Sequence, residues 1–190
     1  MAAGKSVALE VLGRLGAATI SADRIVHDLL DREPMTSVLR ERWGEDIESD
    51  GIVDRAAVGQ RVFTDPAELS WLEKEVHPLV QSEIAEWFST LPADCQVAVV
   101  EVPLLFEGEM ADRFDVTVAV VADETLRRGR AESRGQVGLE GREGRQLSQA
   151  EKAGRADRVI RNDGTTADLE VRLPEMLVEL GAELPTDPHV

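Results

Sequence analysis

The sequence contains a single cysteine, Cys95, which excludes an intramolecular disulfide and any zinc site built from several cysteines. It also lacks an apolar run near the ~20 residues that a membrane-spanning helix needs. Its N-terminus has no basic segment followed by an apolar core, so it does not resemble a secretory signal. These absences predict a protein of a reducing compartment, the cytoplasm, that does not enter a membrane.

Basic residues are scarce as well, since 21 Lys and Arg face 37 Asp and Glu and the formal net charge is −16. Such a balance argues against binding to nucleic acid or to anionic membranes. The stretch from Arg127 to Arg161 is an exception, because it carries a net charge of +5 and leaves −21 for the remainder. This cationic stretch suits a compact anionic ligand, and a pair of solvated basic helices is the alternative.

The 190 residues, of which 43% are hydrophobic and 31% charged, suit one globular domain with or without a small insertion. Apolar spacing predicts helices over about 7–15, about 22–31, three or four segments between 34 and 91, and about 167–180. β-Branched runs predict strands over 17–20, 96–102, 116–122 and 158–161. Two of these runs are continuously apolar rather than alternating, which favours an α/β fold whose parallel sheet has helices on both faces.

Gly4-Lys5-Ser6 stands where the first predicted helix begins, and it matches the second half of the phosphate-binding loop G-x-x-x-x-G-K-[ST]. Amides at a helix N-terminus bind phosphate oxygens, the lysine neutralises the β- and γ-phosphates, and the hydroxyl ligates Mg²⁺. The tripeptide alone fits a capped helix start on the surface equally well.

Carboxylates follow two of the predicted strands. Asp23 lies beyond the strand at 17–20, where ligands bind in open α/β sheets and where a carboxylate can accept a hydroxyl proton. Capping of the next helix by Ser21 or Asp23 is the alternative. Glu101 and Glu107, on either side of a short loop, are candidates for the Mg²⁺ or substrate site, and a turn at the strand end is their alternative.

Taken in chain order, these segments resemble the dephospho-CoA kinase family from Gly4 to about Leu180. The matching segments are Gly4–Val7, Ala22–Ile25, Val76–Val80, Val102–Glu107, Phe114–Val116, and Arg142, Gln146 and Lys152 followed by Ala156–Gly164. Each segment is short, but their common order and spacing make coincidence a poor explanation.

The resemblance implies ATP-dependent phosphorylation of the ribose 3′-hydroxyl of dephospho-CoA, the last step of coenzyme A synthesis. It implies the P-loop NTPase fold of the nucleoside-monophosphate-kinase type, with ATP and Mg²⁺ as cofactors. The implied regions are a core over 1–33, 92–122 and 156–184, a helical substrate-binding region over 34–91, a lid over 123–155 and a disordered tail over 185–190. The implied partner is the small-molecule substrate rather than nucleic acid or membrane, and the sequence leaves the oligomeric state open.

The resemblance also implies roles for single residues. The catalytic residues are Asp23, as base for the 3′-hydroxyl, Lys5 and Arg142. The ATP contacts are Ala2, Ala3, Gly4, Lys5, Ser6, Val7 and Arg134, with Ser6 as the metal ligand and Arg127 as a further phosphate contact of the lid. The substrate contacts are Asp23, His77, Leu104 and Glu107. We expect His77 to hold a helix start at Pro78 rather than to take part in the chemistry.

The beginning of the chain departs from the family, which normally opens with an apolar strand and a glycine-rich turn before Gly-Lys-Ser. Here Met1-Ala2-Ala3 comes directly before Gly4, so we expect the first, central strand and the first half of the phosphate loop to be missing. A true start further upstream is favoured over a genuine truncation. Two alternative functions stay open: a P-loop kinase of another small metabolite or nucleotide, and a catalytically inactive truncated P-loop protein.

Overall fold

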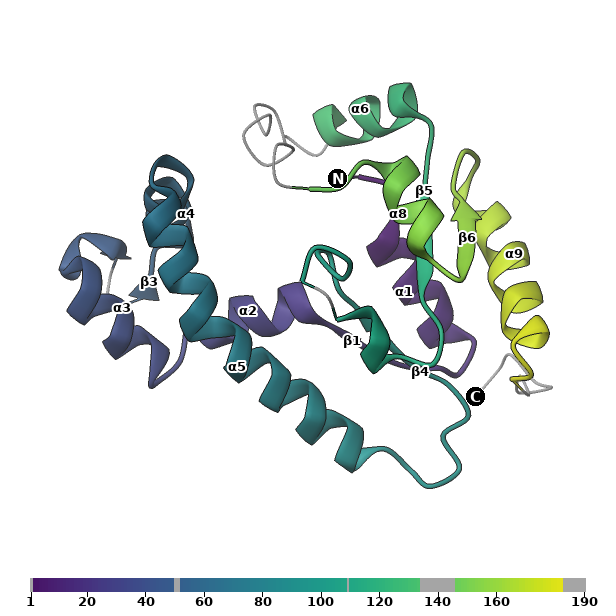
Figure 1. Ribbon diagram of the computed structural model, residues 1–190, viewed down its shortest axis with the longest axis horizontal. Helices are drawn as coiled ribbons and strands as arrows, with labels where there is room; N and C mark the ends of the chain where they lie inside the picture. Colours follow the sequence, from purple (N-terminus) through teal and green to yellow (C-terminus); the bar gives the residue numbers. More distant parts are fainter. Residues whose placement is uncertain (1, 50–51, 109, 134–145, 183–190) are drawn as a thin grey trace. The chain divides into compact units, whose positions relative to one another are not determined.

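The computed structural model describes residues 2–49, 52–108, 110–133 and 146–182 (Figure 1). The chain divides into two compact units. The core unit combines Met1–Thr19 with Pro92–Val190, and the helical unit is Ile20–Leu91. The helical unit begins earlier in the chain than the predicted boundary at residue 34, because α2 (Ala22–Leu30) packs on α5 (Pro66–Thr90).

The described strands of the core unit lie within the predicted β-branched runs or within one residue of them. β5 (Val118–Val121) and β6 (Arg158–Arg161) run parallel in register. The start of β1 (Ala18–Ser21) is joined to the segment that leads into β4 (Ala98–Glu101), since the Ala18 amide donates to the Val97 carbonyl at 2.9 Å. The α/β class is therefore confirmed, whereas the missing first strand stays a prediction.

The core of this unit is built by two helices, α1 (Lys5–Arg14) and α9 (Thr166–Glu179), which pack on each other and on the strands. Their apolar residues recur every three or four positions, so each helix has one apolar face. The buried cluster consists of Ala8, Val11, Leu12, Ile160, Leu169, Leu173, Met176 and Leu177. Figure 1 shows α9 beside β6. Each large side chain buried in this way contributes about 1.5–3 kcal/mol, so the cluster fixes the direction of α1.

Of the three or four helices that the sequence predicts between residues 34 and 91, the structure describes three in the helical unit, and it adds a hairpin that the sequence does not predict. The further elements of this unit are α3 (Met35–Trp43), the 3-10 turn η1 (Glu45–Ile47), β2 (Glu48–Ser49), β3 (Ile52–Val53) and α4 (Arg55–Thr64). The antiparallel strands of the hairpin have two residues each, which is too short for a recognisable sequence period.

One helix of this unit, α5, corrects a prediction. It continues from Pro66 to Thr90 without a break, so the prediction that His77 holds a helix start at Pro78 is wrong. A proline inside a helix removes one backbone hydrogen bond and costs about 3 kcal/mol in isolation. Here Val76 and Val80, on both sides of the proline, are buried, and this packing outweighs the cost.

The predicted lid region begins and ends in the core unit with two short helices, α6 (Glu124–Ser133) and α8 (Gln149–Arg155). The Gln149 side chain holds α8 to the end of β5, because its amide both accepts from the Ala122 amide and donates to the Ala122 carbonyl, each at 2.9 Å. Residues 134–145, which include Arg134 and Arg142, lie outside the described residues, and so does the tail 185–190. A further 3-10 turn, η2, spans Ala111–Arg113.

In the part of the chain described by the structure, no helix combines the length and the apolar character that crossing a bilayer would require.

Hydrogen bonds between Thr117 and Asp157 join the residues that come directly before β5 and β6. The Asp157 carboxylate accepts from the Thr117 amide at 2.8 Å and from the Thr117 hydroxyl at 2.7 Å, and the Asp157 amide donates to the same hydroxyl at 3.1 Å. The hydrogen bond from the Thr117 hydroxyl, and next that from the Thr117 amide, hold the pKa of Asp157 below its ordinary value. Thr117 is buried, so the carboxylate also satisfies polar groups that water does not reach.

We expect Asp157→Asn to lower the melting temperature at neutral pH, and this difference to shrink in acid. A carboxyl whose folded pKa lies below its unfolded value stabilises the protein fully above the unfolded value. The stabilisation is then lost as the pH falls through the folded pKa, so wild type and variant converge below about pH 4. Thermal melting followed by circular dichroism from pH 7 to pH 3 measures this. A difference that stays constant over that range contradicts it, and Asp94→Asn, an exposed carboxyl in a turn, is the control.

Candidate active site

The segment Ala2–Gly4 approaches the N-terminus of α1 in an unusual backbone conformation. Ala2 and Gly4 have φ angles of 58° and 97°, in the left-handed region. Gly4 stands at the N-cap position of α1 and, as a glycine, makes no side-chain capping hydrogen bond. The alternative of a helix start capped by its N-cap side chain therefore does not apply at Gly4. Amides of the first turn that are left without a side-chain cap are available to an anion.

The position of Gly4 admits no side chain. A Cβ atom there would lie 2.0 Å from Nδ2 of Asn162, which is far inside contact distance. Nδ2 of Asn162 donates to the Ala3 carbonyl at 2.9 Å, and Asn162 is buried. The glycine of Gly-Lys-Ser is thus required by both its φ angle and its neighbour.

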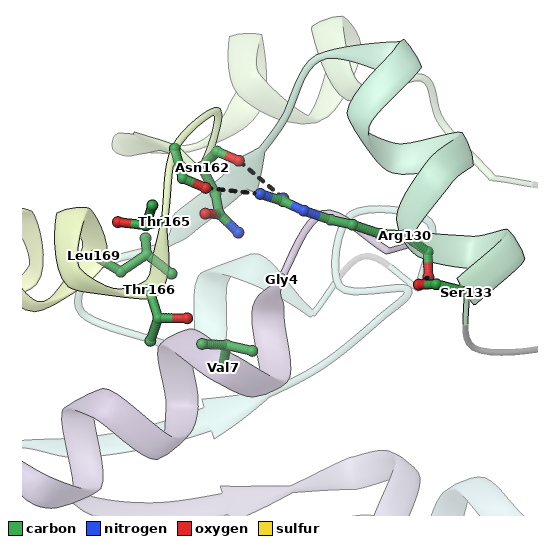
Figure 2. Close-up of a pocket in the computed structure, with 9 residues that line it drawn as sticks. Gly4, Val7, Arg130, Ser133, Asn162, Thr165, Thr166 and Leu169 are labelled. Carbon is green, nitrogen blue, oxygen red and sulfur yellow. Dashed lines mark hydrogen bonds between the residues drawn. The ribbon is translucent and has the colours of Figure 1, made fainter.

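A cavity of about 280 Å³ opens beside this loop within the core unit (Figure 2). It is lined by Gly4, Val7, Arg130, Ser133, Asn162, Gly164, Thr165, Thr166 and Leu169. Its volume is near the lower end of the range for small-ligand pockets, about 300–1,000 Å³. Backbone groups, hydroxyls and one guanidinium dominate the lining, which suits a polar ligand of moderate size.

Arg130 forms one wall of the cavity and is held in place by backbone carbonyls. Its Nη1 donates to the Asn162 carbonyl at 2.9 Å, and its Nη2 donates to the Gly164 carbonyl at 3.0 Å. Figure 2 shows the guanidinium extending from α6 toward these two carbonyls. A guanidinium fixed by two hydrogen bonds offers a planar cationic face on which an aromatic ring can stack.

The structure brings together several of the predicted ATP contacts. Gly4 and Val7 line the cavity, Lys5 is half-buried in the first turn of α1, and Ser6 is exposed beside it. Ala2 and Ala3 form the loop that precedes them. Arg134 and Arg142 fall outside the described residues.

Sequence reasoning missed Arg130, Asn162 and the residues around Thr165 as parts of the site. Asn162 lies inside a segment that carries the family resemblance, but nothing in the sequence gave it a role. Arg130 lies inside the cationic stretch, where charge alone does not separate it from its neighbours. Asn162 reaches the loop before α1 because β6 pairs with β5, and this strand pairing could not be predicted from the sequence.

Asp23, the predicted base, is exposed in the first turn of α2 in the helical unit. The N-cap position of this helix is Ser21, whose side chain makes no capping hydrogen bond. The alternative that Ser21 or Asp23 merely caps the helix is therefore wrong. Since Asp23 belongs to the helical unit and Lys5 to the core unit, a shared site for the two stays a prediction.

Glu107 joins the loop after β4 to α8, through an ion pair with Lys152, and to the segment just before α8. Its Oε1 accepts from Lys152 Nζ at 2.9 Å and from the Leu147 amide at 2.9 Å, and Lys152 also donates to the Pro103 carbonyl at 3.0 Å. Burial raises the pKa of Glu107, but the hydrogen bonds, first of all that from Lys152, bring it below its ordinary value. Oε2 of Glu107 is buried without a hydrogen-bond partner among the described residues. Its predicted contact with substrate stays a prediction.

Four further predicted residues are placed without a test of their roles. Leu104 is exposed in the loop after β4, His77 is exposed on α5, and Glu101 is half-buried at the end of β4. Arg127 on α6 forms an ion pair with Glu124 at 2.9 Å.

The described ranges contain no group of three or more His, Cys, Asp or Glu side chains that could hold a metal ion by themselves. Mg²⁺ in phosphoryl-transfer sites needs few protein ligands, because phosphate oxygens and water supply most of its coordination. The exposed Ser6 hydroxyl next to the loop is a hard oxygen donor of the kind that Mg²⁺ accepts, so the residues present fit such an ion.

Comparison with known proteins identifies the family. The dephospho-CoA kinase family model matches residues 1–168. The chain belongs to the dephospho-CoA kinase family. Dephospho-CoA kinases catalyse the final step of coenzyme A biosynthesis, so the chain is a kinase, a transferase, with ATP as phosphoryl donor and a small molecule as acceptor.

Individual dephospho-CoA kinases are similar to the chain over most of its length. That of Protochlamydia amoebophila is 34% identical over 187 residues, which cover 95% of this chain and 92% of that protein. That of Symbiobacterium thermophilum is 39% identical over 171 residues, covering 87% and 72%.

Solved structures agree in fold. A Thermus thermophilus protein superposes with a TM-score of 0.81 at 32% identity, covering 95% of this chain and 93% of that one. The dephospho-CoA kinase from Campylobacter jejuni superposes with a TM-score of 0.69 at 26% identity, covering 95% and 92%. The predicted family and the predicted fold are both confirmed.

We expect Gly4→Ala to destabilise the protein by about 2 kcal/mol or more, because it adds left-handed strain to a clash with Asn162. Gly129→Ala in α6 is the matched control, since a Cβ there meets open space. The control should be neutral or stabilising by roughly 0.5–1 kcal/mol, as expected for a helix interior. Denaturant unfolding measures both, and equal free energies of unfolding for the two variants would contradict the argument.

We expect Lys152→Met to lower the free energy of unfolding by about 2 kcal/mol, because Glu107 would lose its charged partner in a largely buried place. The double variant Glu107→Leu/Lys152→Met should regain much of this loss, since no uncompensated charge remains. Arg14→Met is the control, because the Arg14–Glu170 pair at 2.7 Å is exposed on both sides. Its loss should cost about 0.5 kcal/mol or less. A Lys152→Met effect no larger than that of the control is the contrary result.

Proposed function

We propose that the chain transfers the γ-phosphoryl group of ATP to the ribose 3′-hydroxyl of dephospho-CoA, with Asp23 as the general base. The observation that carries the proposal is the N-terminus of α1, whose N-cap residue is a glycine in left-handed conformation without a side-chain cap, and which adjoins the cavity of the core unit. Membership in the dephospho-CoA kinase family supplies the acceptor.

The triphosphate lies on the loop Ala2–Gly4 and the first turn of α1. Backbone amides of Ala2, Ala3, Gly4 and the residues after them donate to phosphate oxygens, and the helix dipole favours the negative charge. Lys5 neutralises the β- and γ-phosphates as charge moves onto the leaving oxygen. The Ser6 hydroxyl would hold Mg²⁺, which when bound would neutralise negative charge on the triphosphate.

The base of the nucleotide occupies the cavity, next to Val7. It stacks on the guanidinium of Arg130, which the carbonyls of Asn162 and Gly164 hold in place. Ser133 and the segment after Asn162 supply hydroxyls and backbone groups for the edge of the ring.

The transfer step requires one proton acceptor. Asp23 accepts the proton of the 3′-hydroxyl while the hydroxyl oxygen attacks the γ-phosphorus. The bond between this phosphorus and the β,γ-bridging oxygen breaks, so that ADP leaves. Asp23 is available for this role because it does not cap α2. Arg127, Arg134 and Arg142 of the region 123–155 stabilise the charge on the transferred group, and Arg142 is the one we assign to the catalytic residues.

For the acceptor, we keep the residues that the family resemblance implies. His77 contributes from α5, and Leu104 and Glu107 contribute from the loop after β4. We retain 34–91 as the substrate-binding region and 123–155 as the lid, and the compact helical unit that contains the former also includes residues 20–33. The reaction takes place in the cytoplasm, the compartment in which we expect this protein.

The direct experiment incubates the protein with ATP, MgCl₂ and dephospho-CoA and detects coenzyme A by mass spectrometry. Formation of coenzyme A and ADP in equal amounts is the expected result. Preferred turnover of a nucleoside monophosphate would favour a kinase of another metabolite. ATP binding without turnover of any acceptor would indicate an inactive P-loop protein.

We expect Asp23→Asn to lower kcat by about 10²–10⁴-fold, because an amide does not take up the hydroxyl proton. The KM for ATP should stay nearly unchanged, since Asp23 is not part of the phosphate loop. Asp28→Asn on the same helix is the matched control and should keep the wild-type kcat. Steady-state kinetics with both substrates measures this, and a wild-type kcat in Asp23→Asn would remove Asp23 from the chemistry.

A further inference from the structure

Asn162 connects parts of the core unit that are far apart in the sequence. It directly follows β6, and its backbone amide donates to the Val121 carbonyl at the end of β5 at 2.7 Å. Its own carbonyl accepts from Arg130 of α6. The residue is therefore fixed at the carboxyl ends of two parallel strands, and only 6% of its surface is exposed.

The side chain of Asn162 points at the phosphate loop. Its Nδ2 donates to the Ala3 carbonyl at 2.9 Å and occupies the space that a side chain on Gly4 would need. Burying a side-chain amide is unfavourable unless the amide is hydrogen-bonded. The contact with Ala3 therefore requires a hydrogen-bond donor in the side chain of residue 162.

The loop depends on such support because its backbone is unfavourable by itself. Ala2 has a left-handed φ of 58°, which is unfavourable for a residue with a Cβ. A conformation of this kind persists where the surroundings determine it. The hydrogen bond from Asn162 to Ala3 acts on the peptide between the two left-handed residues.

We propose that Asn162 is a positioning residue for nucleotide phosphates: its side-chain amide holds Ala3 and Gly4 in the conformation that presents the first amides of α1. This inference rests on the proposed function, because it concerns how the same loop binds ATP. Asn162 acts through the loop and does not itself contact the phosphates. The amide is the essential group, because a side chain of the same size without a donor leaves the Ala3 carbonyl buried and unpaired.

The experiment compares binding of inorganic tripolyphosphate by isothermal titration. Asn162→Leu removes the donor without adding charge, and Asn162→Asp removes it while keeping the shape. Both variants should bind tripolyphosphate about tenfold or more weakly, as expected for an unpaired buried acceptor that releases the loop. Gln149→Leu is the matched control, because Gln149 is another amide bonded to a backbone carbonyl near the end of β5. The control should bind as wild type does.

A second readout separates positioning from general damage. In the kinase assay the KM for ATP should rise in Asn162→Leu, whereas the KM for dephospho-CoA should stay unchanged. If Asn162→Asp weakens tripolyphosphate binding and Asn162→Leu does not, the effect is due to the added charge and the proposal is overturned. Equal losses for both substrates, or wild-type binding in both variants, would also overturn it.

A measurement on the wild type covers the case that the variants do not fold. The side-chain amide of Asn162 should exchange slowly with solvent, and its NMR resonances should shift when tripolyphosphate is added. Resonances that do not move at saturating tripolyphosphate overturn the inference while leaving the proposed function intact. Failure of the wild type to bind either tripolyphosphate or ATP would instead refute the proposed function, and the inference with it.

Discussion

The packing of α1 against α9 is the interaction on which the candidate site depends. Val11 and Leu12 of α1 and Leu169 and Leu173 of α9 are almost completely buried, and they hold α1 in one direction relative to the strands. The N-terminus of α1 contributes to binding only if its amides point at a fixed place. Water-excluded contacts along the length of the helix, rather than polar contacts at its end, provide this alignment.

Within the described residues, several basic side chains of the cationic stretch are engaged in contacts inside the protein. Arg130 bonds to two carbonyls, Lys152 pairs with Glu107, Arg127 pairs with Glu124, and Arg161 pairs with Asp163. The net charge of a sequence segment does not distinguish an arginine that supports the backbone from one that binds a phosphate. Arg130 supports the backbone, and the hydrogen bonds that hold it also leave its face at the cavity wall, where the proposed nucleotide base stacks.

Elements with a clear period could be predicted from the sequence, and the site could be predicted only in part. The apolar spacing of α1 and α9 and the β-branched run of β6 gave these elements to within one or two residues. The phosphate loop was accessible because Gly-Lys-Ser is contiguous. Asn162 was not, because its partner Ala3 lies 159 positions away and the pairing of strands decides their contact. The prediction at Pro78 failed because local propensity favours a break there, and tertiary packing overrides it.

Both ends of the region between β5 and β6 are fastened at nearly the same point. At the start of this region, the Asp123 amide donates to the Asp163 carboxylate at 2.7 Å. Near its end, the Gln149 side chain is hydrogen-bonded to the backbone of Ala122. A chain segment that leaves and returns at one place can change length at little cost, since doubling a loop adds only about 0.6 kcal/mol of closure entropy. The sheet therefore constrains the length of this region only through its two fastened ends.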